Sequence, residues 1–313
     1  MPSRTPDVRA VALQPALADQ LRGTFAALLE AMRPKQWIKN VFVLAGLVFA
    51  GQLFERAACA RALSAFLIFC CASSAVYLVN DVFDRANDLH HPVKRLRAIP
   101  SGRLPVPVAM AAAVLLAAGA IAGSFALSRE TLLIVVIYLA SSAGYTWGLK
   151  RVFILDVLIV ASGFVLRAAA GAAAVNAEIS AWLVCCTFLL ALYLALCKRR
   201  NELTLLGEAA RQHRDNLGSY DVALLDSWLT ALSGATIVCY ALYTQSPRTV
   251  QNFHSTNLLY TIPFVIYALF RYQHLVLREN AGGDPASSLL RDRGMMIAIL
   301  GWAAVAAFIV YAR

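Results

Sequence analysis

Apolar runs of membrane-spanning length recur along almost the whole chain and constrain its fold more than any other feature. An α-helix of about 20 apolar residues matches the hydrocarbon thickness of a bilayer. It also satisfies its backbone hydrogen bonds internally, as lipid requires. We therefore predict an all-α fold, a polytopic membrane helical bundle of about nine transmembrane helices. The predicted spans are residues 37–54, 63–83, 106–126, 131–148, 153–175, 180–197, 228–245, 257–273 and 294–312.

The composition agrees with a membrane protein. Hydrophobic residues make up 60% of the chain and charged residues 15%, whereas a soluble domain averages about half and a quarter. Residues 1–30 are predicted to be a cytoplasmic N-terminal tail, and residues 31–313 one transmembrane catalytic domain. The net charge of +10 is not read as a sign of nucleic-acid binding, because in a membrane protein the location of the cations is more informative than their sum.

The cations lie mostly on one predicted side of the membrane. With the N-terminus placed inside, 22 of the 28 Lys and Arg residues fall in inner segments. The positive-inside rule then predicts a cytoplasmic N-terminus and an outer C-terminus. The long polar connections also lie on the inner side, so we expect the chemistry at the cytoplasmic face.

An acidic motif ends the second predicted span. In a helix, Asp81, Asp84 and Asp88 share one face over about two turns, with Asn80 beside them. Carboxylates at a membrane boundary are costly unless paired or bound to a cation, and Mg²⁺ prefers oxygen ligands. We predict a Mg²⁺ site at Asn80, Asp81, Asp84 and Asp88. The alternative is a solvated polar helix end.

A cationic loop with turn residues follows the acidic motif. It contains Lys94, Arg95 and Arg97 between His91-Pro92 and Pro100-Ser101-Gly102. Lys and Arg side chains in such a loop are suited to binding phosphate groups. The alternative is that they only set the membrane topology.

Two motifs resemble those of a known family. The run N-D-x-x-D-x-x-x-D at 80–88 resembles the first Asp-rich motif of the UbiA-type intramembrane prenyltransferase superfamily. The run Y-T-W-G-L-K-R at 145–151 is similar to the Tyr…Lys-Arg element of that family. The resemblance implies a UbiA-like helical bundle with a lateral lipid opening and a cytoplasmic active site.

A second family motif is missing, which points to a narrower branch. Typical members carry D-x-x-x-D between the sixth and seventh spans, whereas this chain has C-K-R-R-N-E-L at 197–203. Residues 33–40, 91–97, 163–167 and 198–202 instead resemble the decaprenyl-phosphate phosphoribosyltransferases. That resemblance implies transfer of 5-phosphoribose from phosphoribosyl diphosphate to a polyprenyl phosphate. It also implies a bacterial inner membrane location and a supply of arabinose-type donors for envelope glycans.

The resemblance implies a set of site residues. Asp81, Asp84 and Asp88 are the expected catalytic residues that hold Mg²⁺. The expected substrate-binding residues are Lys35, Lys39, Asn40, Asn80, Lys94, Arg95, Arg97, Tyr145, Lys150, Arg167, Lys198, Arg199 and Glu202. Lys35 and Lys39, four apart in a helix, are expected on one face.

Several of these residues have simpler interpretations. The two lysines are suited to reaching lipid headgroups, and Tyr145 to an interfacial position. Arg167 lies inside a span rich in small residues and is suited to a structural pairing. Asp156 would lie on nearly the same face.

Two other functions compete with phosphoribosyl transfer. The first is conventional prenyl transfer to an aromatic or ring acceptor, and the absence of the second Asp motif from this chain counts against it. A transporter would spread polar residues through the spans and show two related halves, whereas the polar residues concentrate on one side. The expected partners are a polyprenyl phosphate, phosphoribosyl diphosphate and the membrane, without nucleic acid. A homo-oligomer is compatible with the sequence.

Overall fold

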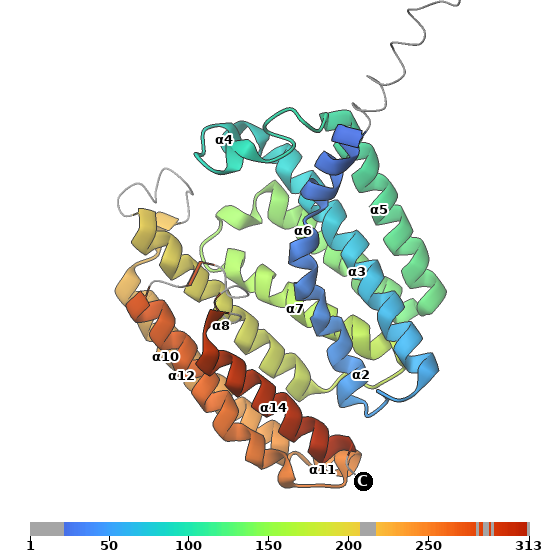
Figure 1. Cartoon of the computed structure of the whole chain (residues 1–313), viewed down its shortest axis with the longest axis vertical. Helices are drawn as coiled ribbons and strands as arrows, with labels where there is room; N and C mark the ends of the chain where they lie inside the picture. Colours follow the sequence, from blue (N-terminus) through green and yellow to red (C-terminus); the bar gives the residue numbers. More distant parts are fainter. Residues whose placement is uncertain (1–21, 207–216, 280–281, 284–287, 289–290, 312–313) are drawn as a thin grey trace, which may run out of the picture. The chain divides into compact units, whose positions relative to one another are not determined.

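The computed structural model describes residues 22–206, 217–279, 282–283, 288 and 291–311. Within these residues the regular elements are α- and 3₁₀-helices, with no β-strand (Figure 1). The all-α prediction is therefore confirmed. The chain divides into two compact units, each described by itself. The first unit comprises Met1–Asn40 and Leu67–Gly123, and the second comprises Val41–Phe66 and Ser124–Arg313.

The first unit is built from a helix at residues 22–32 and parts of two long helices. These are α3 (Arg56–Phe83) from Leu67 onward and α5 (Val106–Leu127) as far as Gly123. Between them lie the short helices α4 (Arg85–Leu89) and η2 (Lys94–Leu96). Its apolar core contains Ala27, Ala31, Leu78, Ala98, Ile99, Leu104, Ala109 and Ala113. The predicted tail boundary at residue 30 thus falls inside a helix that packs on this core.

The cationic loop is folded back onto the core of the first unit. Ala98 and Ile99 are buried, and the Leu104 N–H donates to the Ala98 carbonyl at 2.9 Å. Gly102 has a φ of +79°, a conformation that glycine adopts without a steric penalty. This closed turn fixes the loop beside the end of α3.

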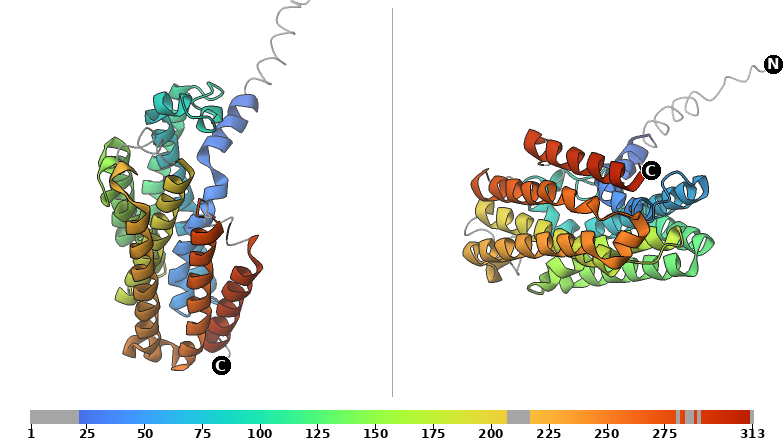
Figure 2. Two further views of the ribbon diagram at one scale, coloured as in Figure 1. Left: turned by 90° about the vertical axis from the view of Figure 1, so that its left-hand side faces the viewer. Right: turned by 90° about the horizontal axis from the view of Figure 1, so that it is seen from below.

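The second unit is a bundle of longer helices. The 3₁₀-helix η1 (Pro34–Leu44) enters it and continues as α2 (Ala45–Phe49). It then contains α6 (Arg129–Trp147), η3 (Leu149–Arg151), α7 (Leu155–Ala174), α8 (Ala181–Leu206), η5 (Leu217–Ser219), α10 (Val222–Gln245), α11 (Pro247–Phe253), η6 (Asn257–Thr261), α12 (Ile262–Glu279) and α14 (Arg293–Tyr311). Helix α7 packs against α2, α6 and α8, α8 packs on α10, and α12 runs beside α14 (Figure 2).

Glycines permit a close approach between the α2 segment and α7. A Cβ atom on Gly171 would lie 1.7 Å from the carbonyl oxygen of Val43, and one on Gly46 would lie 2.4 Å from the Ala172 nitrogen. Small residues at helix contacts in membranes serve this purpose. Gly171 is one of the small residues in the predicted 153–175 span.

The predicted count of nine spans is not confirmed. Among the described residues, seven helices are long and apolar enough to cross a membrane: α3, α5, α6, α7, α8, α10 and α14. The segments Pro247–Phe253 and Asn257–Glu279 make an eighth if they form one span, bent by 99°. The predicted span 37–54 forms η1 and the five-residue α2 instead. Lys39 and Asn40 make the beginning of this span less apolar than that of the other spans.

Candidate functional site

Two carboxylates of the acidic motif are buried together in the first unit. Asp81 lies in the last turn of α3, and Asp88 lies in α4. Although α3 ends at Phe83, the helical path continues, because Asp84 N–H donates to Asn80 O at 2.9 Å and Asp88 N–H donates to Asp84 O at 2.8 Å. The side chains of Asp81 and Asp88 are only 3% and 5% exposed. Their burial requires cationic partners.

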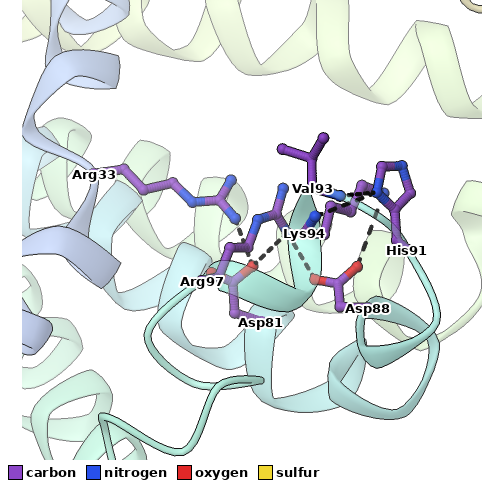
Figure 3. Close-up of polar contacts among 7 residues, drawn as sticks. All are labelled: Arg33, Asp81, Asp88, His91, Val93, Lys94 and Arg97. Carbon is purple, nitrogen blue, oxygen red and sulfur yellow. Dashed lines mark hydrogen bonds and ion pairs between the residues drawn. The ribbon is translucent and has the colours of Figure 1, made fainter.

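Three cations surround the two carboxylates (Figure 3). The Nη1 atom of Arg97 lies 3.2 Å from Asp81 Oδ1 and 2.8 Å from Asp88 Oδ2, so it bridges them. Arg33 Nη2 lies 2.5 Å from Asp81 Oδ1. Lys94 Nζ lies 3.9 Å from Asp88 Oδ1. We refer to these five residues as the acidic site.

Arg33 belongs to the acidic site but was not among the predicted site residues. It follows the helix at residues 22–32 with a φ of +56°, and its guanidinium lies 5.0 Å from the centre of the Tyr77 ring. Such stacking is typical of arginine on aromatic faces. Two signals in the sequence could have indicated it: Arg33 begins the run 33–40 that resembles the narrower family branch, and it precedes a proline, where a residue tends to leave the α-helical conformation.

His91 organises the loop that carries the cations. Its Nδ1 atom accepts hydrogen bonds from the backbone N–H groups of Val93 and Lys94, both at 3.2 Å (Figure 3). This turn directs Lys94 toward Asp88. Arg95, the third cation predicted in the loop, is exposed.

The donor set of the acidic site fits a divalent cation. Asp81 and Asp88 converge on one guanidinium nitrogen, which shows that the pair already accommodates a positive group. Asn80 and Asp84, the other predicted ligands, are half-buried, and Asp84 does not join Asp81 and Asp88 in a group of three carboxylates, contrary to the prediction of one shared face. Within the described chain, no three acidic, histidine or cysteine side chains are grouped for metal binding. Mg²⁺ commonly takes one or two carboxylates and completes its shell with water and substrate phosphates.

The first 3₁₀-helix changes the expected positions of three residues. In a 3₁₀-helix, residues four apart are separated by about 120°, so Lys35 and Lys39 do not share the helical face that was predicted. Lys35 is exposed and Lys39 is half-buried. Asn40 is fully buried, and its amide nitrogen lies 3.3 Å from both Cys70 Sγ and Ser73 Oγ. These contacts support a packing role for Asn40.

A second polar cluster lies in the second unit, at the C-terminal end of α8. Arg199 is 5% exposed, and its Nε donates to Asp156 Oδ2 at 2.8 Å while its Nη1 donates to Glu202 Oε2 at 2.6 Å. Asp156 is fully buried in the first turn of α7, where the helix dipole favours a negative charge. It also accepts from the hydroxyl of Tyr220 at 2.8 Å. We call these four residues the arginine cluster.

Other predicted residues lie around the arginine cluster or next to it in sequence. Tyr145 is close enough to Arg199 to interact with it electrostatically. Lys150 is half-buried in η3, and Lys198 is exposed on α8. Arg200, which was not predicted, ties α8 to two helices: its Nε contacts Asp226 at 2.5 Å, and its Nη1 donates to the carbonyl of residue 276 at 3.1 Å.

Arg167 is buried within α7, at 6% exposure. Its guanidinium donates to the Tyr138 hydroxyl at 2.9 Å and to the Gly163 carbonyl at 2.8 Å. It also lies 4.8 Å from the centre of the Tyr138 ring. Asp156, which the sequence placed on nearly the same face, pairs with Arg199 instead.

The fold and the two polar clusters define a class: an α-helical membrane protein with acidic and cationic groups near helix ends. Comparison with known families makes the class specific. The model of the UbiA prenyltransferase family matches residues 40–299. The chain belongs to this family.

Two relatives and one solved structure describe the relationship further. The chain is 36% identical to the decaprenyl-phosphate phosphoribosyltransferase of Corynebacterium glutamicum, over 91% of this chain and 86% of that protein. It is 34% identical to the enzyme of the same name from Mycolicibacterium smegmatis, over 88% of this chain and 90% of that protein. Its fold resembles a UbiA homolog from Archaeoglobus fulgidus bound to GPP and Mg²⁺, with a TM-score of 0.69 at 16% identity, covering 91% of this chain and 99% of that one.

Proposed function

We propose that this protein transfers 5-phosphoribose from phosphoribosyl diphosphate to a polyprenyl phosphate. A phosphate oxygen of the lipid attacks C1 of the ribose, and the bond from C1 to the diphosphate oxygen breaks. Diphosphate leaves and the anomeric carbon is inverted. The acceptor phosphate is already ionised at neutral pH, so the reaction depends on positioning and charge stabilisation rather than on a strong general base.

The observation that carries this proposal is the arginine cluster. Its position corresponds to the second Asp motif that the resemblance assigns to prenyl-transferring members of the family. Here Asp156 and Glu202 both accept hydrogen bonds from Arg199, so these carboxylates hold the Arg199 guanidinium in place. The donor brings a diphosphate and a 5-phosphate, and the acceptor brings a third phosphate. Lys198, the exposed neighbour of Arg199 in the chain, adds a cationic group suited to that load.

The relatives support the same reaction. Two bacterial proteins named decaprenyl-phosphate phosphoribosyltransferase align with about nine-tenths of each chain at 34–36% identity. An alignment of this extent spans residues 81–97 of the acidic site and the arginine cluster. It favours a polyprenyl phosphate as acceptor.

The acidic site is proposed to bind the donor diphosphate. Asp81, Asp84 and Asp88, with Asn80, would hold Mg²⁺. The ion would neutralise the charge that develops on the leaving diphosphate. Lys94, Arg95 and Arg97 extend from the loop that His91 organises, and they would bind phosphate oxygens. Arg33 and Arg97 keep the two buried carboxylates in place.

An apolar cavity in the second unit suits a lipid acceptor. It has a volume of about 410 Å³ and lies among α2, α8, α10, α12 and α14. Its walls are mostly aromatic and aliphatic side chains, including Phe49, Trp182, Tyr193, Phe264 and Trp302. Such a lining binds isoprenoid chains through apolar contact.

The distribution of cations supports an orientation. We propose a bacterial cytoplasmic membrane location with the N-terminus and the active site inside and the C-terminus outside. The positive-inside bias of the sequence and the bacterial origin of the relatives support it. Cysteine labelling in spheroplasts tests the orientation, with the variants Arg95→Cys and Arg248→Cys made in a protein whose seven native cysteines are replaced by serine. Residue 95 should be protected from a membrane-impermeant reagent and residue 248 should react.

A substrate-choice assay tests the proposed reaction. The purified protein in detergent, with Mg²⁺, is given either phosphoribosyl diphosphate and decaprenyl phosphate or a prenyl diphosphate and 4-hydroxybenzoate. We expect a phosphoribosylated lipid from the first pair and no prenylated acid from the second. The reverse pattern would establish conventional prenyl transfer.

A further inference from the structure

A strained turn directly precedes α7 in the second unit. Ile154 has a φ of +67° and a ψ of −41°, and the Leu155 N–H donates to the Phe153 carbonyl at 2.8 Å. This is a γ-turn of the rare, strained type. A β-branched residue with positive φ is an outlier, and such strain persists only where the surrounding structure enforces it.

The hydroxyl of Tyr220 holds both this turn and the arginine cluster. It accepts a hydrogen bond from the backbone N–H of Ile154 at 3.1 Å and donates one to Asp156 Oδ1 at 2.8 Å. Its ring packs against Phe153, with ring centres 4.7 Å apart, and against Trp228, with ring centres 6.4 Å apart. Tyr220 lies just before α10 and is 6% exposed.

The chemistry of the hydroxyl suits this double role. Burial raises the pKa of Tyr220 well above its ordinary value, and the hydrogen bond to the Asp156 carboxylate raises it further. The phenol therefore stays protonated across the physiological range. A protonated hydroxyl donates one hydrogen bond and accepts others, as observed here.

We infer that Tyr220 is a positioning residue for phosphate binding. Through Asp156 it fixes Arg199, because the second oxygen of the same carboxylate accepts from Arg199 Nε. Through the turn at Ile154 it fixes the preceding helix η3. This helix carries Lys150 and ends three residues before Ile154. One hydroxyl thus sets two cations, Arg199 and Lys150, relative to each other. The inference rests on the proposed phosphoribosyl transfer, in which these cations bind substrate phosphates.

The variant Tyr220→Phe tests this role, because it removes the hydroxyl and keeps the ring. We expect kcat/KM for phosphoribosyl diphosphate to fall at least about tenfold, mainly through KM. Tyr311→Phe is the matched control. Like Tyr220, Tyr311 packs against a phenylalanine ring, and it donates its hydroxyl to a backbone carbonyl at 3.0 Å, but it lies outside both polar clusters. It should keep the kcat/KM of the unaltered enzyme.

A double-mutant cycle separates positioning from general stability. If Tyr220 acts through Arg199, Tyr220→Phe should have a much smaller effect in an Arg199→Lys background. Additive losses, or an unchanged kcat/KM in Tyr220→Phe, would overturn the inference. If Tyr220→Phe does not fold, the substitution is combined with Ile154→Gly in one protein. Glycine adopts a positive φ without strain, so the turn then no longer depends on the Tyr220 hydroxyl. The loss relative to Ile154→Gly alone should remain.

The unaltered enzyme is measured alongside the variants. Absence of turnover with phosphoribosyl diphosphate and decaprenyl phosphate would overturn the proposed function, and this inference with it. Normal turnover of the unaltered enzyme together with normal turnover of Tyr220→Phe would overturn the inference alone.

Discussion

Arg33 and Asp81 are 48 residues apart in the chain, yet the Arg33 Nη2 atom lies 2.5 Å from Asp81 Oδ1. The pair joins the end of the first helix to the last turn of α3. Because the Asp81 side chain is 3% exposed and the Arg33 side chain 25%, the carboxylate depends on this partner more than a surface group would. Hydrogen bonds to such a charge are stronger than those between neutral groups.

Replacing Arg33 should therefore impair the acidic site. We expect Arg33→Ala to lower kcat/KM by about tenfold or more, since a charge-assisted hydrogen bond contributes roughly 1.5–3 kcal/mol. Arg33→Lys should recover part of the loss, because it keeps the charge without the planar fork. Arg22→Ala, at an exposed position on the same helix, is the control and should stay within twofold. Equal activity in Arg33→Ala and Arg22→Ala would contradict this prediction.

The acidic site should determine the response to Mg²⁺. Chelation with EDTA is expected to stop turnover, and Mg²⁺ to restore it. Asp81→Asn should raise the Mg²⁺ concentration for half-maximal rate by about tenfold or more, since even outer-shell changes commonly cost 10–100-fold in metal affinity. Asp226→Asn alters a carboxylate that pairs with Arg200 outside the acidic site, so its Mg²⁺ curve should match the unaltered enzyme. A matching curve for Asp81→Asn would refute the assignment.

Gly171 should be intolerant of a side chain. A Cβ atom there would lie 1.7 Å from the Val43 carbonyl oxygen, so Gly171→Ala must displace backbone. Overpacking of this kind typically costs about 1–3 kcal/mol, and we expect a lower thermal midpoint in detergent. Gly234→Ala, inside α10 with nothing within 4 Å of the added atom, should leave the midpoint unchanged or slightly higher. A Gly171→Ala midpoint equal to that of Gly234→Ala would show that the close approach is absent.

Asp292 should contribute stability in a pH-dependent way. Hydrogen bonds from Arg271 and from the Met295 backbone N–H hold the pKa of Asp292 below its ordinary value. A lowered pKa means that the contribution is present above the unfolded pKa of about 3.9 and is lost as the pH falls through the folded value. The difference in thermal midpoint between the unaltered protein and Asp292→Asn should be full near pH 6 and shrink below pH 4. A difference that does not change with pH would exclude this linkage.

The fold was largely predictable because lipid imposes a simple rule on sequence. The predicted runs 106–126 and 131–148 correspond closely to α5 and α6. A continuous apolar run of this length can be identified from hydropathy alone, without knowledge of the helices that pack against it. The first predicted span was different. Its residues form η1 and α2, and the closeness of Val43 to Gly171 depends on tertiary packing that hydropathy does not report.

The site was predictable only in its local part. The 100° spacing of a helix placed Asp81 and Asp88 on one face, and they are buried together. Their partner Arg33 was not predicted, because the return of the first helix to the end of α3 is a tertiary relationship. Tyr220 carried no periodic signal and no motif, so its contacts with Ile154 and Asp156 appear only in the folded chain.

The central claim is that the group transferred is a phosphoribosyl group. The most direct measurement uses two preparations of phosphoribosyl diphosphate, one with ³²P in the 5-phosphate and the other with ³²P in the diphosphate. Each is followed separately during turnover with decaprenyl phosphate. The 5-phosphate label should move into the organic phase with the lipid, one per acceptor consumed, and the diphosphate label should stay in the aqueous phase. Diphosphate label in the lipid, or no label from either donor, would contradict the account.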